Sequence, residues 1–125
     1  MALNERMTVI EGIAQAIGSG ATSTLNSIDC STDTGTYIRI VVMVVSNTGH
    51  AWAIVKTMVL NQQANTIIGT FNEIGPAHSF SASAPTLTVG LDAGGILTVQ
   101  VTNNLGGGGT LDAQSWLYKE ELVIR

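Results

Sequence analysis

The sequence of 125 residues has few charged side chains: Asp, Glu, Lys and Arg together make up 11% of it, against about 25% in an average soluble domain. Only five of these residues are basic, and they are scattered along the chain. A surface that follows phosphates needs clustered Lys and Arg, and so does a surface that binds anionic lipids. The composition therefore predicts neither a nucleic-acid partner nor membrane insertion.

Cysteine and long apolar runs are also scarce. Cys30 is the one cysteine, which excludes a disulfide within the chain and a cysteine metal cluster. The longest apolar run, Ile40–Val45, is far shorter than the roughly 20 residues that span a bilayer. Glu5, Arg6 and Glu11 interrupt the first apolar stretch, whereas a signal peptide has an uncharged apolar centre. We expect a protein made without an export signal.

The residues that are abundant favour β-structure. Fourteen glycines accompany many Thr, Val and Ile residues, a composition typical of strands joined by turns. Turn signals recur every 8–12 residues, which predicts a small antiparallel β-sandwich or jelly-roll-like domain, all-β in the main. The expected strands are Thr22–Asp29, Tyr37–Ser46, His50–Leu60, Thr66–Asn72 (ended by a break at Gly75-Pro76), a short piece at Ser79–Ser83, Thr86–Leu91, Ile96–Asn103 and Gln114–Ile124.

The first segment has a different spacing. Its apolar residues are separated by steps of 4, 3, 4 and 3, which is the spacing of a heptad seam: Leu3, Met7, Ile10, Ala14 and Ile17. This predicts a short N-terminal helix over residues 1–20 that ends in a Gly-Ser-Gly hinge, followed by a β-sandwich domain over 21–125. The helix could cap the β domain or be the end of a coiled-coil stalk, and a strand is a third alternative.

Two of the expected strands, Tyr37–Val45 and His50–Leu60, are apolar on both faces. An antiparallel sheet in a small monomer normally has one solvated face, and Ile96–Asn103 does alternate cleanly between apolar and polar residues. A neighbouring subunit could cover the second apolar face of these strands and so remove it from water. We therefore predict an oligomer interface that includes Val42, Val44, Trp52, Ile54, Met7, Ile10 and Ile17.

The sequence carries no recognisable catalytic or metal-binding motif. The Gly106–Gly109 run lacks the lysine of a phosphate loop. Glu120 and Glu121 are adjacent on a strand, so they point to opposite faces and cannot flank one bond. The soft metal ligands have no local pairing: Cys30, His50 and His78. We expect no catalytic residue, no metal and no cofactor.

The order of motifs in the last two thirds of the chain resembles that of a known family. The motifs are an apolar hairpin (YIRIVVMVVSNTGHAWAIVKTMVL), an I-I-G-T strand, a T-L-T-V…G-G-I-L-T-V-Q-V-T-N hairpin, and a Gly-rich loop before a W-x-Y-x-x-E-x-V-I strand. The segment from about Tyr37 to Arg125 is similar to the C-terminal β-domain of bacteriophage virion proteins such as tail fibres. That family implies no catalytic residues.

Together these observations predict a non-enzymatic virion structural protein, expected to be a homotrimer that acts by assembly and surface recognition. Its partners would be copies of itself, other virion proteins, and a glycan or protein of the host surface. The rival prediction is a carbohydrate-binding, lectin-like β-sandwich. Against it stands the position of Trp52 and Trp116 in the middle of apolar strands, where packing is the commoner role of an indole.

Overall fold

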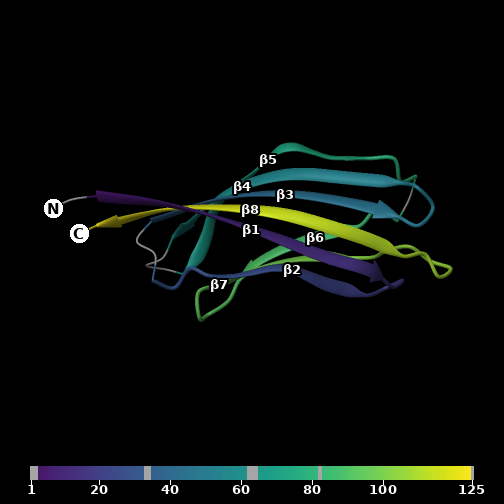
Figure 1. Cartoon of the computed structure of the whole chain (residues 1–125), viewed down its shortest axis with the longest axis horizontal. Helices are drawn as coiled ribbons and strands as arrows, with labels where there is room; N and C mark the ends of the chain where they lie inside the picture. The colour runs from purple at the N-terminus through teal and green to yellow at the C-terminus, as the bar shows by residue number, and fades with distance from the viewer. Residues whose placement is uncertain (1–2, 33–34, 62–64, 82, 125) are drawn as a thin grey trace.

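A computed structural model describes residues 3–32, 35–61, 65–81 and 83–124 as two packed antiparallel sheets (Figure 1). The described residues form strands and connecting turns, and among them there is no helix. The strands are β1 (Leu3–Ile17), β2 (Thr22–Asp29), β3 (Gly35–Ser46), β4 (Ala51–Asn61), β5 (Thr66–His78), β6 (Thr86–Leu91), β7 (Ile96–Thr102) and β8 (Leu111–Ile124).

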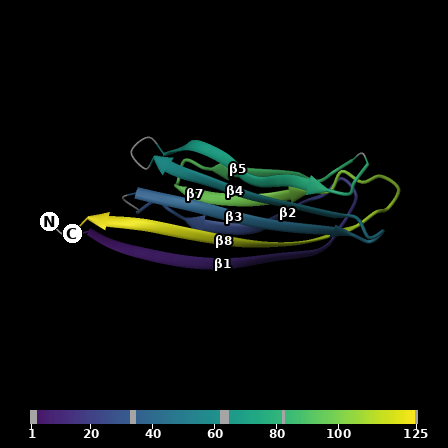
Figure 2. The same cartoon turned by 90° about the horizontal axis from the view of Figure 1, so that it is seen from above.

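The larger sheet has the strand order β1-β8-β3-β4-β5, and the smaller one has the order β2-β7-β6. Figure 2 shows the five long strands side by side in front of the smaller sheet. Every neighbouring pair is antiparallel. The prediction of a sandwich-like, antiparallel all-β fold is therefore confirmed.

The core lies between the two sheets and is made of alternate residues on each strand. On β3 these are the even-numbered residues from Ile38 to Val44, and on β7 they are the odd-numbered residues from Leu97 to Val101; all are fully buried. Fully burying one such side chain contributes about 1.5–3 kcal/mol to folding. The strict alternation on β7 is the pattern that the sequence predicted for a half-buried strand.

The prediction of an N-terminal helix is wrong, because Leu3–Ile17 forms β1 at the edge of the larger sheet. β1 pairs with β8 residue by residue, from Leu3 opposite Ile124 to Ala14 opposite Ala113. Its apolar residues face both ways: Met7 points outward, whereas Ile10 packs against the core. A strand with two apolar faces contains the steps of 3 and 4 that a heptad also has, so the spacing alone could not separate the two structures.

Gly12 explains why β1 can lie close to the smaller sheet. A Cβ atom on Gly12 would stand 2.0 Å from the carbonyl oxygen of Leu25 on β2, far inside van der Waals contact. β1 leads into β2 through the turn at Gly18, whose carbonyl accepts a hydrogen bond from the Ala21 N–H at 3.0 Å. Residues 18–20, predicted as a hinge, thus form the turn between the two sheets.

Most other element bounds agree with the sequence prediction. β2 and β6 have the predicted ends, and Gly49, with a φ of 87°, makes the predicted turn after β3. β5 continues through Gly75-Pro76 to His78, so the predicted break there is wrong; proline is tolerated because β5 is an edge strand. The predicted strand at 79–83 is absent from residues 79–81 and 83, and most of the predicted turn at 62–65 lies outside the described residues.

In the described part of the chain, no helix has the length and apolar character needed to cross a membrane.

Candidate assembly surface

The outward side of the five-stranded sheet, called here the outer face, carries many exposed apolar side chains, with charged residues such as Glu11, Arg39 and Glu120 among them. The pairing register brings outward residues of all five strands into rows across the sheet; one row contains Val9, Tyr118, Arg39, Thr57 and Phe71. Every large apolar side chain that the structure describes as exposed belongs to this face: Met7, Val9, Ile13, Tyr37, Met43, Val45, Val59, Ile68, Phe71 and Ile74.

The size of the outer face is that of a specific protein interface. Four interstrand spacings of about 4.8 Å plus one strand width make the sheet about 24 Å wide, and a strand of 12 residues is about 40 Å long. The outer face therefore covers roughly 950 Å². A standard interface buries about 800 Å² on each partner, so this face is large enough for one.

Near the middle of the outer face, one charged pair is neutralised within the chain. Arg39 Nε lies 3.0 Å from Glu73 Oε2, and the Arg39 guanidinium lies 5.9 Å from the centre of the Tyr118 ring. An exposed ion pair of this kind contributes about 0.2–1 kcal/mol. The pair matters more for assembly. If another subunit covers the outer face, each of the two charges already has a partner of opposite sign, which lowers the free-energy cost of removing them from water.

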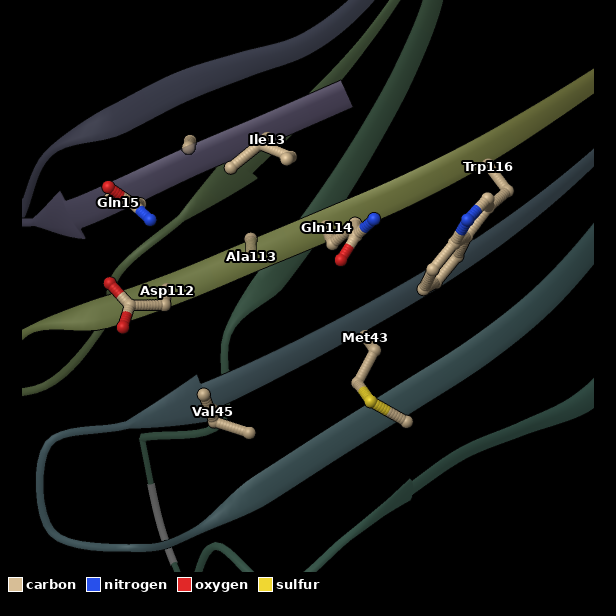
Figure 3. Close-up of a pocket in the computed structure, with 9 residues that line it drawn as sticks. Ile13, Gln15, Met43, Val45, Asp112, Ala113, Gln114 and Trp116 are labelled. Atoms are coloured by element: carbon tan, nitrogen blue, oxygen red, sulfur yellow. The ribbon is translucent and has the colours of Figure 1, made fainter. Parts of the chain in front are cut away.

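A hollow of about 240 Å³ opens at one end of the outer face. Figure 3 shows its walls, with Met43 and Val45 on β3, Trp116 and Gln114 on β8, and Ile13 on β1. The Asp112 carboxylate at its end accepts a hydrogen bond from the Ala16 N–H at 2.8 Å. The hollow thus combines an indole, a thioether and aliphatic carbon with carboxamide groups and one hydrogen-bonded carboxylate.

The structure places most of the predicted interface residues in the chain's own core. Val42, Val44, Trp52 and Ile54 are buried between the two sheets. Ile17 is buried as well, Ile10 is partly buried, and Met7 is exposed on the outer face. The first four expose at most 4% of their surface, so they offer little area to a second chain while the fold is intact. The residues of the same strands that are available for an interface point to the opposite face.

Apart from Met7, the exposed apolar residues of the outer face were not among the predicted interface residues; examples are Ile13, Met43 and Phe71. The signal for them was the two-sided apolar character of Tyr37–Val45. Which of the two faces is covered by the second sheet cannot be read from one strand, because it depends on packing between strands far apart in sequence.

The two histidines lie close together but form no recognisable catalytic or metal site. The rings of His50 and His78 both pack near Phe80, with ring centres 5.4 and 6.2 Å from it. His50 Nδ1 lies 3.3 Å from Ser79 Oγ, and Cys30 is buried elsewhere in the core. Among the described residues, no group of three His, Cys, Asp or Glu side chains could hold a metal ion. The expectation of no metal, cofactor or catalysis stays a prediction.

Glu120 and Glu121 point to opposite faces, as predicted. Glu120 lies in the outward row of Met7 and Tyr37, whereas Glu121 faces inward and its carboxylate lies 3.4 Å from Lys119 Nζ. The two carboxylates therefore cannot act on one glycosidic bond.

The Gly106–Gly109 loop is held by a buried side chain rather than shaped around a phosphate. Asn103 is fully buried; its Nδ2 donates to the carbonyls of Ile17 at 2.8 Å and Gly109 at 3.0 Å. Its Oδ1 accepts from the Leu105 N–H at 2.8 Å. Asn103 thus ties the end of β1 and the loop before β8 to the end of β7.

One carboxyl group has a shifted pKa. The pKa of Asp29 lies below its ordinary value because the side chain accepts hydrogen bonds from the hydroxyl and the backbone N–H of Ser31, with a smaller effect of the nearby Lys119 charge. Asp29 is exposed on β2, away from the outer face.

Neither the comparison with protein-family models nor the comparison with curated protein sequences gave a match for this chain.

Proposed function

We propose that the protein is a non-enzymatic structural subunit that assembles into a homotrimer by covering the outer face with further copies of itself. The observation that carries this proposal is that, among the side chains the structure describes, all ten exposed large apolar ones lie on that one face. If about half of the roughly 950 Å² is apolar, covering it is worth about 12 kcal/mol per subunit. That is comparable to the 4–15 kcal/mol that association is thought to cost.

The virion is the proposed location, and other virion proteins and a host-surface glycan or protein are the proposed further partners. This part of the proposal rests on the resemblance of the Tyr37–Arg125 segment to bacteriophage appendage domains. The jelly-roll-like form of the sandwich belongs to the same proposal, and eight strands is the number that jelly rolls have.

A substitution on the outer face that leaves the core untouched tests the proposal. Val59 lies on β4, is 43% exposed, and takes part neither in the core nor in the hollow. Val59→Glu should leave the circular dichroism of the subunit unchanged and reduce the mass measured by light scattering to that of one chain, 13.0 kDa. Burying an unpaired carboxylate in an interface is unfavourable by several kcal/mol.

The matched control is Thr88→Glu, which adds the same charge to an exposed position on the smaller sheet. It should assemble like the unchanged protein. Loss of assembly in both variants would show that added negative charge, rather than the outer face, is responsible. Retained assembly in Val59→Glu would contradict the proposal.

A second candidate function, carbohydrate binding, is favoured by one observation. The hollow brings the Trp116 indole together with Gln114 and Asp112, and an aromatic ring beside a few polar groups is a common arrangement in ligand sites. A glycan array probed with the unchanged protein and with Trp116→Ala tests this candidate. Binding that is lost with the indole would support it.

A further inference from the structure

The outer face has an apolar ridge at one margin and the hollow near the other. The ridge consists of Ile68, Phe71 and Ile74 on the edge strand β5. The hollow lies between β1, β8 and β3. Since β8 and β5 are three strands apart in the sheet, β5 and β8 are separated by about 15 Å measured across the strands.

Phe71, 65% exposed, is the most exposed of the large apolar side chains that the structure describes. Its strand is at the edge of the sheet and has a neighbouring strand, β4, on one side. Its backbone is nevertheless held, because the Phe71 carbonyl accepts a hydrogen bond from the Thr57 hydroxyl at 3.4 Å. An aromatic side chain that is exposed on a fixed backbone is well suited to be an interface anchor.

The walls of the hollow suit an aromatic ring. The Met43 thioether is flexible and makes favourable contacts with aromatic rings, and the Trp116 indole offers an offset or edge-to-face partner. The volume of about 240 Å³ is below the roughly 300–1,000 Å³ of typical small-molecule sites. The hollow therefore fits a single side chain better than an oligosaccharide.

We propose that Phe71 of one subunit inserts into the hollow of a neighbouring subunit. The inference rests on the proposed self-assembly and names the contact through which it occurs. Phe71 cannot reach the hollow of its own chain, because both lie on the same side of one sheet, β4 lies between them, and Phe71 is in the row of Arg39 whereas the hollow begins at Met43, four residues further along β3.

The contact joins two different surfaces of the subunit. The ridge of each subunit therefore binds the hollow of one neighbour, and its hollow binds the ridge of another. Such heterologous contacts close into a ring when the rotation between subunits allows it, and three copies would form the expected trimer. The Arg39–Glu73 pair lies in the same region as Phe71, so the charges next to the inserted ring are already partnered.

The first test measures association of Phe71→Ala by light scattering over a dilution series. Removing an aromatic anchor from an interface should weaken association at least about 30-fold. Phe71→Leu, which keeps apolar bulk, should recover part of the loss. Because Phe71 is exposed in the single chain, the variant should retain the thermal stability of the isolated subunit.

The second test locates the contact by mixing two variants that keep Phe71 and carry one added cysteine each, Ile74→Cys on the ridge and Gln114→Cys in the hollow. A disulfide forms only between backbones about 4.4–6.8 Å apart, so mild oxidation of the mixture should link one variant to the other. Thr88→Cys mixed with Gln114→Cys is the matched control and should remain unlinked. The native Cys30 is fully buried and should not react in either mixture.

Assembly that is lost in Val59→Glu but unchanged in Phe71→Ala would overturn the ridge-and-hollow contact and leave the proposed assembly in place. A protein that is monomeric without any substitution would instead overturn the proposed assembly itself. Saturable glycan binding that depends on Trp116, together with unchanged assembly of Phe71→Ala, would assign the hollow to a sugar and overturn the contact.

Discussion

The outward sides of the two sheets have opposite characters. On the smaller sheet, the outward residues of β7 are mostly Thr and Gln, and they bond to their neighbours: the hydroxyls of Thr22 and Thr102 lie 2.7 Å apart, and Gln100 Nε2 donates to Thr24 at 3.1 Å. On the larger sheet, the outward positions carry many Val, Ile, Met and aromatic residues, with a few charged ones such as Arg39 and Glu120 among them. Since both sheets share one core, burial of the core cannot explain the difference.

This difference in side-chain polarity indicates which outward face is in contact with water. Threonine favours strands, and its hydroxyl can form hydrogen bonds with water. The outward face of the smaller sheet can therefore be exposed to solvent without a partner. The outer face of the larger sheet instead exposes apolar area of the kind that marks interaction sites. We therefore interpret the smaller sheet as the solvated side of the subunit and the larger sheet as its contact side.

The substitution with the largest expected effect distinguishes the two faces of a single strand. Val42 points into the core and is fully buried, so Val42→Asp would place an unpaired carboxylate between the sheets. A buried, unpaired charge should destabilise the subunit by more than about 4 kcal/mol, enough to unfold it. Circular dichroism should show loss of the β signal.

Val45→Asp is the control for Val42→Asp, since it places the same residue on the same strand facing outward. It should keep the fold and affect assembly alone. Equal unfolding by both variants would mean that the outer face is buried within the subunit.

A smaller effect is expected where the two sheets are tied together. Asn103→Ala removes three hydrogen bonds of a buried side chain and leaves the carbonyls of Ile17 and Gly109 without this donor. Each such loss is worth about 0.5–1.5 kcal/mol, so the free energy of unfolding should fall by about 2–4 kcal/mol. Urea unfolding measures it.

The neighbouring Asn104→Ala is the matched control for Asn103→Ala. Asn104 also donates two hydrogen bonds, to Ala84 at 2.9 Å and Thr86 at 2.8 Å, but it is exposed. Water can take the place of Asn104 as the hydrogen-bond donor, so Asn104→Ala should lower the free energy of unfolding by no more than about 1 kcal/mol. A loss as large as that of Asn103→Ala would show that burial is not what makes Asn103 important.

These predictions also show what the sequence could and could not establish. β6 could be bounded from the sequence because alternation and turn residues agree there, whereas β2 alternates weakly and was bounded by the turn residues on each side of it. β1 could not be recognised, because Met7 and Ile10 are both apolar although they lie on opposite faces. The choice between Val42 and Met43 as contact residues could not be made either, since it depends on where the second sheet packs.

The smallest predicted effect concerns the solvated sheet. The pKa of Asp29 is lowered in the folded state, so its charge adds stability above the pKa of the unfolded chain. This contribution disappears as the pH falls through the lower, folded-state pKa. Asp29→Asn should therefore lower the melting temperature slightly at neutral pH and make it less dependent on pH below about 4.

Ser31→Ala, which removes the hydroxyl donor, should reproduce part of the effect of Asp29→Asn. Neither change should alter assembly, because Asp29 lies on the smaller sheet. A change in oligomeric mass in either variant would contradict the assignment of the two faces.

The most direct test of the central claim is the rate at which peroxide oxidises Met43, measured by mass spectrometry at high and low protein concentration. Met43 is 52% exposed on the outer face of the single chain, whereas Met58 is buried in the core at 1%. If copies of the protein cover the outer face, Met43 should be protected at high concentration and become reactive on dilution, while Met58 stays protected throughout. Equal, rapid oxidation of Met43 at every concentration would contradict the account.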